Sequence, residues 1–504
     1  MSIASRDRRR WFALGALALA MLTIGLDVTV LTVALPTLAA DLGANNSQLQ
    51  WFSSAYTLVL AAAMLPAGAL GDRYGRKKLL LGALALFGAA SLACSYAGDS
   101  GQLILARAVL GLAAATMIPL SMAVLPVLFG DPDERSRALT IWVTSTAIGL
   151  PLGPILGGWL LDNFWWGSVF LINVPLVVVG AVAVAVLVPE SRTVDPHRPD
   201  YCGAVASSIG LLGLTYGFIE AGQRGWGSGI SWLAIVSGTA MLAAFAVWER
   251  RAKYPLIDVN LFRARGFRWG TAFTTLVNFG MFGLFFTVPQ YFQAVLGVDA
   301  LGSGLRLLPL IGGLIIGIRI VDVLLRSAGP RPALVVGFAL LAAALALGAT
   351  TSVGPPYWFV AGWIALVGAG MGMVMPAVMG VAIDELSVQR AGSGSALIQA
   401  LRQAGGTIGV AILGTVLATR YRSQLGGLNS EPISDGVNAG VAVAKAAHDP
   451  AMLEHVQASF MSGMSLMLWV CTGSCALAAV LAIRAAPRAR DRQDSDASQS
   501  VHVG

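Results

Sequence analysis

The chain has 504 residues, of which 56% are hydrophobic and 12% are charged. Soluble proteins carry about 25% charged residues, so this composition excludes a soluble enzyme or binding domain and indicates a polytopic membrane protein. The formal net charge of +7 does not indicate nucleic-acid binding, because the lysines and arginines are spread over many short polar segments between apolar runs.

Runs of about 20 apolar residues are long enough to cross the roughly 30 Å of hydrocarbon in a bilayer. Such runs follow one another along almost the whole chain, which leaves little room for a soluble domain. We therefore predict an all-α polytopic membrane protein with 14 transmembrane helices. The expected spans are residues 11–38, 48–70, 78–97, 102–128, 136–162, 167–188, 202–221, 230–248, 268–294, 303–324, 332–350, 357–383, 392–420 and 461–485.

The distribution of basic residues predicts how the chain is oriented. Most of the 33 lysines and arginines lie before the first span, in the loops after even-numbered spans, or after the last span. The opposite loops hold Arg224, Arg420, Arg422 and Lys445. By the positive-inside rule both termini are expected on the cytoplasmic side. The richness in alanine, glycine and arginine is typical of GC-rich bacterial genes, so we expect a bacterial cytoplasmic membrane.

Two distant segments share a spacing that predicts an internal repeat. Gly111 stands eight residues before Pro119, and Gly368 stands eight residues before Pro376. If these segments correspond, spans 1–6 match spans 9–14, and spans 7 and 8 are inserted between two six-helix halves. The expected divisions are a cytoplasmic N-terminal segment (1–10), an N-terminal half (11–188), a linker with the two inserted helices (189–267), a C-terminal half (268–485) with a flexible or lid-like external loop (421–459), and a disordered cytoplasmic tail (486–504).

One carboxylate, Asp27, lies inside the apolar stretch LDVTVLTVALP of residues 26–36. An aspartate at the centre of a membrane helix costs roughly 2.5–3.5 kcal/mol, so we expect it to have a partner or a function. Arg107 is expected at a comparable depth in the fourth span. If the protein couples transport to protons, these two residues form the predicted coupling site; a static ion pair is the alternative, in which case Glu220 or Asp322, the other acids inside expected spans, would carry the proton.

A second set of polar residues predicts a substrate cavity. Arg402 lies ten residues into its span, about 15 Å along the helix and hence near the middle of the membrane. Gln290, Tyr291 and Gln293 in the ninth span offer adaptable polar and aromatic groups that suit varied apolar substrates. The alternative for Arg402 is a packing charge bonded to backbone carbonyls, and helix packing explains the aromatic residues equally well.

Several segments carry a resemblance to a known family. GALGDRYGRKK at 68–78 resembles the loop motif G-x-L-x-D-R-x-G-R-K of the major facilitator superfamily, and GLPLGPILGG at 149–158 resembles the antiporter motif of its drug exporters. The stretch at 26–36 resembles the first-helix motif of the fourteen-helix drug:proton antiporter branch, with Thr32 in place of the usual Asn. Shorter matches at 107–111, 170–176, 255–262 and 402–415 extend the resemblance along nearly the whole chain.

The resemblance implies a major facilitator fold with 14 transmembrane helices, arranged as two six-helix repeats plus two inserted central helices. It also implies a gating loop made of Gly68, Asp72, Arg73, Gly75 and Arg76, and an antiporter motif made of Gly149, Gly153, Pro154, Gly157 and Gly158. The glycines of that motif recur every four residues, which leaves one helix face bare enough for close packing.

The implied function is proton-coupled efflux of drugs or antibiotics by alternating access, with small amphipathic substrates, protons and membrane lipids as partners and a monomer as the functional unit. The expected energy source is the proton gradient, with no cofactor and no metal. The alternative on the same fold is a dedicated exporter of a single metabolite, such as a self-made antibiotic, an amino acid or a siderophore. An enzyme is not expected, because no loop clusters His, Asp and Ser and there is no phosphate-binding loop motif.

Overall fold

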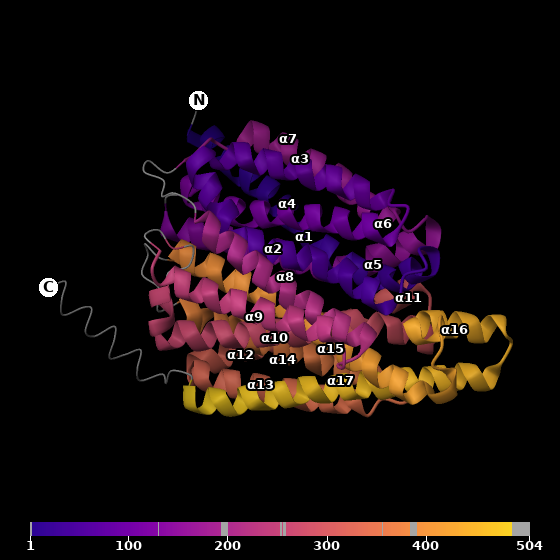
Figure 1. Cartoon of the computed structure of the whole chain (residues 1–504). Coiled ribbons are helices and arrows are strands. Elements are labelled where there is room, and N and C mark those ends of the chain that lie inside the picture. The colour runs from indigo at the N-terminus through magenta and orange to yellow at the C-terminus, as the bar shows by residue number, and fades with distance from the viewer. Residues whose placement is uncertain are drawn as a thin grey trace.

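The computed structural model describes residues 3–129, 131–192, 200–252, 255, 259–354, 356–383 and 391–485. Throughout these residues the chain forms helices and short connections, without a strand (Figure 1). The helices are α1 (Ile3–Asp41), α2 (Asn46–Tyr74), α3 (Arg76–Ser95), α4 (Ser100–Leu128), α5 (Pro132–Asn163), α6 (Ser168–Leu171), α7 (Asn173–Leu187), α8 (Tyr201–Arg224), α9 (Gly229–Glu249), η1 (Val259–Arg263), α10 (Arg265–Gln290), the π-helical turn η2 (Tyr291–Val295), α11 (Ala300–Leu305), α12 (Leu308–Ser327), α13 (Pro330–Ala349), α14 (Tyr357–Ile383), α15 (Ala391–Leu425), η3 (Gly426–Leu428), η4 (Ile433–Asp435), α16 (Val437–Ala446) and α17 (Pro450–Ala485).

The long helices lie side by side in one elongated bundle (Figure 1). Helix α1 begins and α17 ends at the same end of the bundle, which we call the terminal end; the opposite end, which carries α11 and α16, is called the α16 end. Twelve helices within the described residues are long and apolar enough to cross a membrane. The expectation of an all-α polytopic membrane protein is therefore confirmed.

The exact number of spans stays a prediction. Helices α2 and α5 coincide with the second and fifth expected spans and have 29 and 32 residues, but they are not among the twelve. Both contain residues whose side chains lie outside the described part of the chain. The tail at 486–504 also lies outside the described residues.

Polar caps set where several helices begin. At α2, Asn45 and Gln48 form a capping box, in which each side chain accepts a hydrogen bond at 2.9 Å from the other residue's backbone N–H. Asp99 accepts a bond from a first-turn N–H of α4 at 2.9 Å, and Asp299 does the same for α11 at 2.8 Å. Because these caps satisfy backbone groups that the helix cannot, the turns at the α16 end are held by short polar contacts.

The helices pack in a pattern that occurs twice. Helix α1 packs on α5 and α2 packs on α4, and in the later part of the chain α10 packs on α15 and α12 packs on α14. Gly111 in α4 lies against the backbone of Tyr56 in α2, and Gly368 in α14 lies against the backbone of Leu310 in α12. We call α1–α7 the first helix group and α10–α17 the second helix group; most of the buried apolar residues of each group form one cluster.

Helices α8 and α9 stand beside the two groups. They pack closely on each other, and α8 contacts both α2 and α15. Thr415 Oγ1 of α15 donates a hydrogen bond to the backbone oxygen of Phe218 in α8 at 2.7 Å. The pair therefore covers the seam where α2 of the first helix group meets α15 of the second.

Residues 421–459, expected to form a flexible or lid-like loop, are largely helical. Helix α15 continues to Leu425, α16 occupies Val437–Ala446, and α17 already begins at Pro450. The side of α16 formed by Val437, Gly440, Val441 and Ala444 is buried, and α16 packs on α17. The sequence did not predict α16, because its apolar pattern covers only ten residues. A helix of that length depends on tertiary packing for its stability.

The close packing of α14 on α12 generates a stability prediction. A Cβ at Gly368 would meet the Leu310 carbonyl, whereas nothing lies within 4 Å of a Cβ at Gly362 in the same helix. We expect Gly368→Ala to destabilise the protein by roughly 1–3 kcal/mol through overpacking. Gly362→Ala should be neutral or stabilising, since alanine favours a helix interior. Thermal unfolding of the detergent-purified protein measures both, and equal melting temperatures would contradict the assigned contact.

Candidate functional site

Asp27 and Arg107 form an ion pair in the interior of the first helix group. Arg107 Nη1 of α4 donates a hydrogen bond to Asp27 Oδ2 of α1 at 2.6 Å. The side chain of Asp27 is 0% exposed and that of Arg107 is 1% exposed. Asn173 Nδ2 of α7 donates to the other carboxylate oxygen, Asp27 Oδ1, at 3.0 Å. Both oxygens of the buried carboxylate therefore have a hydrogen-bond donor, as a charge in a low-dielectric site requires.

Arg107 is held from further directions as well. Its Nε donates to the backbone oxygen of Phe52 in α2 at 3.1 Å, and its guanidinium lies 4.5 Å from the ring centroid of Tyr56. Four helices of the first helix group, α1, α2, α4 and α7, thus converge on one pair of opposite charges. A buried pair of this kind is sensitive to any change in either charge, because removing one partner costs about 3–5 kcal/mol.

The two other acids expected inside spans have different surroundings. Glu220 Oε1 lies 2.6 Å from Nε of Arg224 on the same helix, α8, so its charge is balanced one turn away. Asp322 is exposed on α12. Asp27 is the one of these three acids that is both fully buried and shared between helices.

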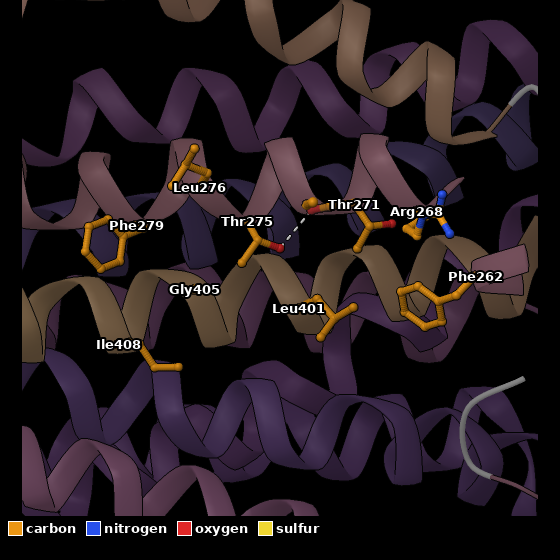
Figure 2. A pocket seen from close by; sticks show the side chains of 10 residues that line it. Phe262, Arg268, Thr271, Thr275, Leu276, Phe279, Leu401, Gly405 and Ile408 are labelled. Carbon is orange, nitrogen blue, oxygen red and sulfur yellow. Dashed lines mark hydrogen bonds between the residues drawn. The ribbon is translucent and has the colours of Figure 1, made fainter. Parts of the chain in front are cut away.

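The structure describes a pocket of about 500 Å³ between α10 and α15 (Figure 2). Its lining is mostly apolar, with one cation and two threonines: Phe262, Arg268, Thr271, Ala272, Thr275, Leu276, Phe279, Leu401, Gly405 and Ile408. Arg402, expected to line a substrate cavity, is the neighbour of Leu401 and is half-buried, but it is not part of this lining. Its Nε has no hydrogen-bond partner among the described residues.

The remaining residues of the expected substrate cavity lie elsewhere. Gln290 is buried and its Nε2 donates to the backbone oxygen of Phe286 one turn earlier, at 2.8 Å. Tyr291 is fully buried, with its ring centroid 5.6 Å from that of Phe292. Gln293 Nε2 reaches across to α1 and donates to the backbone oxygen of Val33 at 3.0 Å. None of these three side chains lines the described pocket, and their place in a substrate cavity stays a prediction.

The expected gating loop joins α2 to α3 at the terminal end. Gly75 has φ of +108°, a conformation that residues with a side chain rarely adopt, and its N–H donates to Gly71 O at 3.0 Å. Arg76 Nη1 donates to the backbone oxygen of Ala123 in α4 at 3.1 Å. Arg73 stacks its guanidinium on Tyr74, 5.5 Å from the ring centroid. Gly68 faces Pro119 of α4, and the side chain of Asp72 lies outside the described part of the chain.

Glu190, just after α7, completes this loop. Its Oε1 accepts a hydrogen bond from the backbone N–H of Lys77 at 3.1 Å, and its Oε2 accepts from that of Lys78 at 3.2 Å. A carboxylate at a helix N-terminus is favourable because it satisfies free N–H groups and faces the positive end of the helix dipole. Residues more than a hundred positions apart thus share one contact, which no local pattern in the sequence indicated.

The glycines of the expected antiporter motif form the crossing between α5 and α1. A Cβ at Gly149 would lie 2.7 Å from Leu22 O, Gly153 lies against Thr29, and Gly157 lies against Val30. The small residues of α5 also contact the second helix group. Gly158 lies against the backbone of α11, and the carbonyl of Pro154 lies against Gly304 of α11. This bare face therefore brings α5 close to α1 and to α11 at once.

Further contacts join the two helix groups at the α16 end. Leu301 N–H of α11 donates to Asp162 Oδ2 of α5 at 3.1 Å, in addition to the bond from Gln293 to Val33. Gly414 of α15 lies against Gln50 near the start of α2. In this structure the bundle is therefore closed between its groups at the α16 end.

Comparison with known proteins places the chain in a family. The family model for the Major Facilitator Superfamily matches residues 17–410. The chain belongs to this superfamily, which consists of transporters rather than enzymes.

Relatives and solved structures agree with this assignment. The tetracenomycin C resistance and export protein of Streptomyces glaucescens is 31% identical over 493 residues, covering 94% of this chain and 91% of the relative. The multidrug efflux pump LfrA of Mycolicibacterium smegmatis is 31% identical over 467 residues, covering 91% and 92%. A bacterial homologue of the human lysosomal transporter Spinster, solved in an inward-facing and occupied conformation, matches with a TM-score of 0.66 at 16% identity over 94% of this chain and 97% of that one. This last likeness shows the fold.

The buried ion pair generates a stability prediction. We expect Arg107→Leu to lower the stability by about 3–5 kcal/mol, because Asp27 is then left buried without its counter-charge. The double variant Asp27→Asn/Arg107→Leu should recover much of this loss. Thermal unfolding in detergent measures the cycle, with Arg319→Leu at an exposed site of α12 as the control. A single variant as stable as the native protein would contradict the pairing.

Proposed function

We propose that the protein exports amphipathic drugs or antibiotics across the cytoplasmic membrane in exchange for protons. The observation that carries this proposal is the buried pair of Asp27 and Arg107, which is a titratable group placed where four helices meet. The relatives support the proposal as well. Two proteins that are 31% identical to this chain over nearly their whole length are named as an antibiotic resistance and export protein and as a multidrug efflux pump.

The proton acts through the carboxylate of Asp27. When Asp27 is ionised, its two oxygens hold Arg107 of α4 and Asn173 of α7 against α1. When Asp27 is protonated, the attraction to Arg107 is lost, while Arg107 keeps its bond to Phe52 O and its contact with Tyr56. The packing of α1 against α4 then has two states of different stability, so protonation biases the arrangement of the helices.

Alternating access converts this bias into transport. The terminal end carries the basic loop residues Arg73, Arg76, Lys77 and Lys78, so we assign it to the cytoplasm by the positive-inside rule. The α16 end is then external, and the contacts of α5 with α11 close the exit in the present state. Opening that end requires α5 to separate from α11, and their contact through Gly158 and Gly304 holds few side chains that would have to be displaced.

A dedicated exporter of a single metabolite is the second candidate, because one relative is named for tetracenomycin C alone. A relative of equal identity, LfrA, is named as a multidrug efflux pump, which supports the broader function. A substrate panel separates the candidates. We expect measurable export for several unrelated amphipathic compounds, whereas export confined to one compound would identify a dedicated exporter.

Proton coupling is tested by dye efflux from proteoliposomes under an imposed pH gradient. We expect the native protein to export the dye and Asp27→Asn to lose at least tenfold in gradient-driven rate while it still binds dye, because a neutral amide cannot take up a proton. Asp322→Asn, which removes an exposed acid on α12, is the matched control and should export as the native protein does.

The result that would overturn the coupling role is active, gradient-driven export by Asp27→Asn. The pair with Arg107 would then be a structural contact. Loss of export in Asp322→Asn with retention in Asp27→Asn would move the coupling site to α12.

A further inference from the structure

The pocket between α10 and α15 has features that the export mechanism does not use. It runs along α10 from Arg268 to Phe279, which is 11 residues or about 16 Å of helix. This length is roughly half of a 30 Å hydrocarbon core. Figure 2 shows Arg268 and Thr271 at one end of the pocket and Phe279 at the other, with the two helices forming its sides.

The pocket lies on the outer flank of α15 and not on its side toward the first helix group. Thr407 Oγ1 of α15 hydrogen-bonds Thr57 Oγ1 of α2 at 2.7 Å, so this position faces α2. A helix turns by about 100° per residue, so the lining residue Gly405, two positions earlier, points to nearly the opposite side. No residue of the first helix group is among those that line the pocket. Its walls therefore open toward the surroundings of the bundle.

Helix α8 bounds this flank at one end only. Thr415, seven residues after Ile408 and therefore on the same side of α15, contacts α8. The pocket lies about two turns closer to the terminal end, and α8 and α9 contribute no residue to its lining. In a membrane, the space beside this part of α15 is occupied by lipid.

The end of the pocket nearest the terminal end is basic. Arg268 is exposed at the mouth, and the same short segment carries Arg263 and Arg265, which are exposed as well. Among the described residues Arg268 has no ion-pair partner. An apolar groove that ends in an unneutralised arginine at the depth of the headgroups matches a molecule with an anionic head and a hydrocarbon chain.

A buried polar group points to the same ligand. Thr271 lines the pocket, is 3% exposed, and its hydroxyl has no hydrogen-bond partner among the described residues. A buried hydroxyl without a partner is unfavourable, so it is expected to gain one when the site is filled. Thr271 stands one turn after Arg268 on α10 and can donate to an oxygen held near that arginine.

We propose that the groove between α10 and α15 binds an anionic phospholipid, with its phosphate at Arg268 and Thr271 and an acyl chain along Ala272, Leu276, Phe279, Leu401 and Ile408. The lipid contacts α10 and α15, whose packing contributes to the core of the second helix group, so its binding supports this group. Because the groove lies on the outer flank of α15, the bound lipid is a membrane component and not a transported substrate.

The test is lipid binding by the full-length protein purified in a neutral detergent. Native mass spectrometry and thermal unfolding are followed while phosphatidylglycerol or phosphatidylcholine is added. We expect one retained phosphatidylglycerol and a raised melting temperature for the native chain, with phosphatidylcholine bound more weakly. Arg268→Gln should weaken phosphatidylglycerol binding about fivefold, since one basic residue near a membrane surface contributes about this much.

Two further variants separate the groove from general surface charge. Arg263→Gln removes the same charge from the same segment but outside the lining, and it should bind phosphatidylglycerol as the native protein does. Ala272→Trp fills the groove without a change in charge and should abolish retention; should this variant fail to fold, the comparison of Arg268→Gln with Arg263→Gln stands alone.

Three results would overturn the proposal. Equal losses in Arg268→Gln and Arg263→Gln would mean a diffuse basic surface. Equal retention of phosphatidylcholine and phosphatidylglycerol would remove the role of the charge. Displacement of the lipid by inorganic phosphate at similar concentration would mean a free-anion site without an acyl groove.

Discussion

The pairing of Asp27 with Arg107 is the constraint on which the first helix group depends. A lone charge at this depth is expensive, and both residues are withdrawn from solvent completely. The structure resolves the difficulty by surrounding the pair with Asn173, a backbone carbonyl and an aromatic ring, drawn from helices that are far apart in the chain. The helices α1, α2, α4 and α7 therefore cannot move independently while the pair is intact. The same dependence makes the pair suited to sensing a proton.

Close approach of helix backbones is the second principle of the structure. Lipid tails are as apolar as leucine, so burial of apolar surface does little to hold membrane helices together, and contact at short range matters more. Glycines provide this contact where α5 crosses α1, where α4 crosses α2 and where α14 crosses α12. At these crossings the glycines leave room for the backbone or a short side chain of the partner helix, and a bare helix face lets that partner shift along it. Stability and the capacity to rearrange thus come from the same residues.

Much of the fold could be predicted from the sequence, because hydropathy is a local property that is summed over about 20 residues. The expected spans reproduce the long helices, and the resemblance to the major facilitator superfamily is confirmed by the match of the family model. The site was predicted less completely. The pairing of Asp27 with Arg107 could be predicted because a charge in an apolar run is conspicuous. The contacts of Gln290 and Tyr291 could not, because a polar or aromatic residue in a helix carries no information about which side faces a cavity.

The sequence by itself determined that this protein is polytopic and all-helical, and it indicated that two opposite charges lie at matching depth. These follow from hydropathy and from the position of a charge within an apolar run, which are local properties of the chain. Only the tertiary structure decided the partners of those charges, the anchoring of α3 by Glu190, the helical form of residues 437–446 and the groove on the outer flank of α15. The physical reason is distance along the chain: Asn173 and Asp27 are 146 residues apart, and such contacts exist only once the helices have packed.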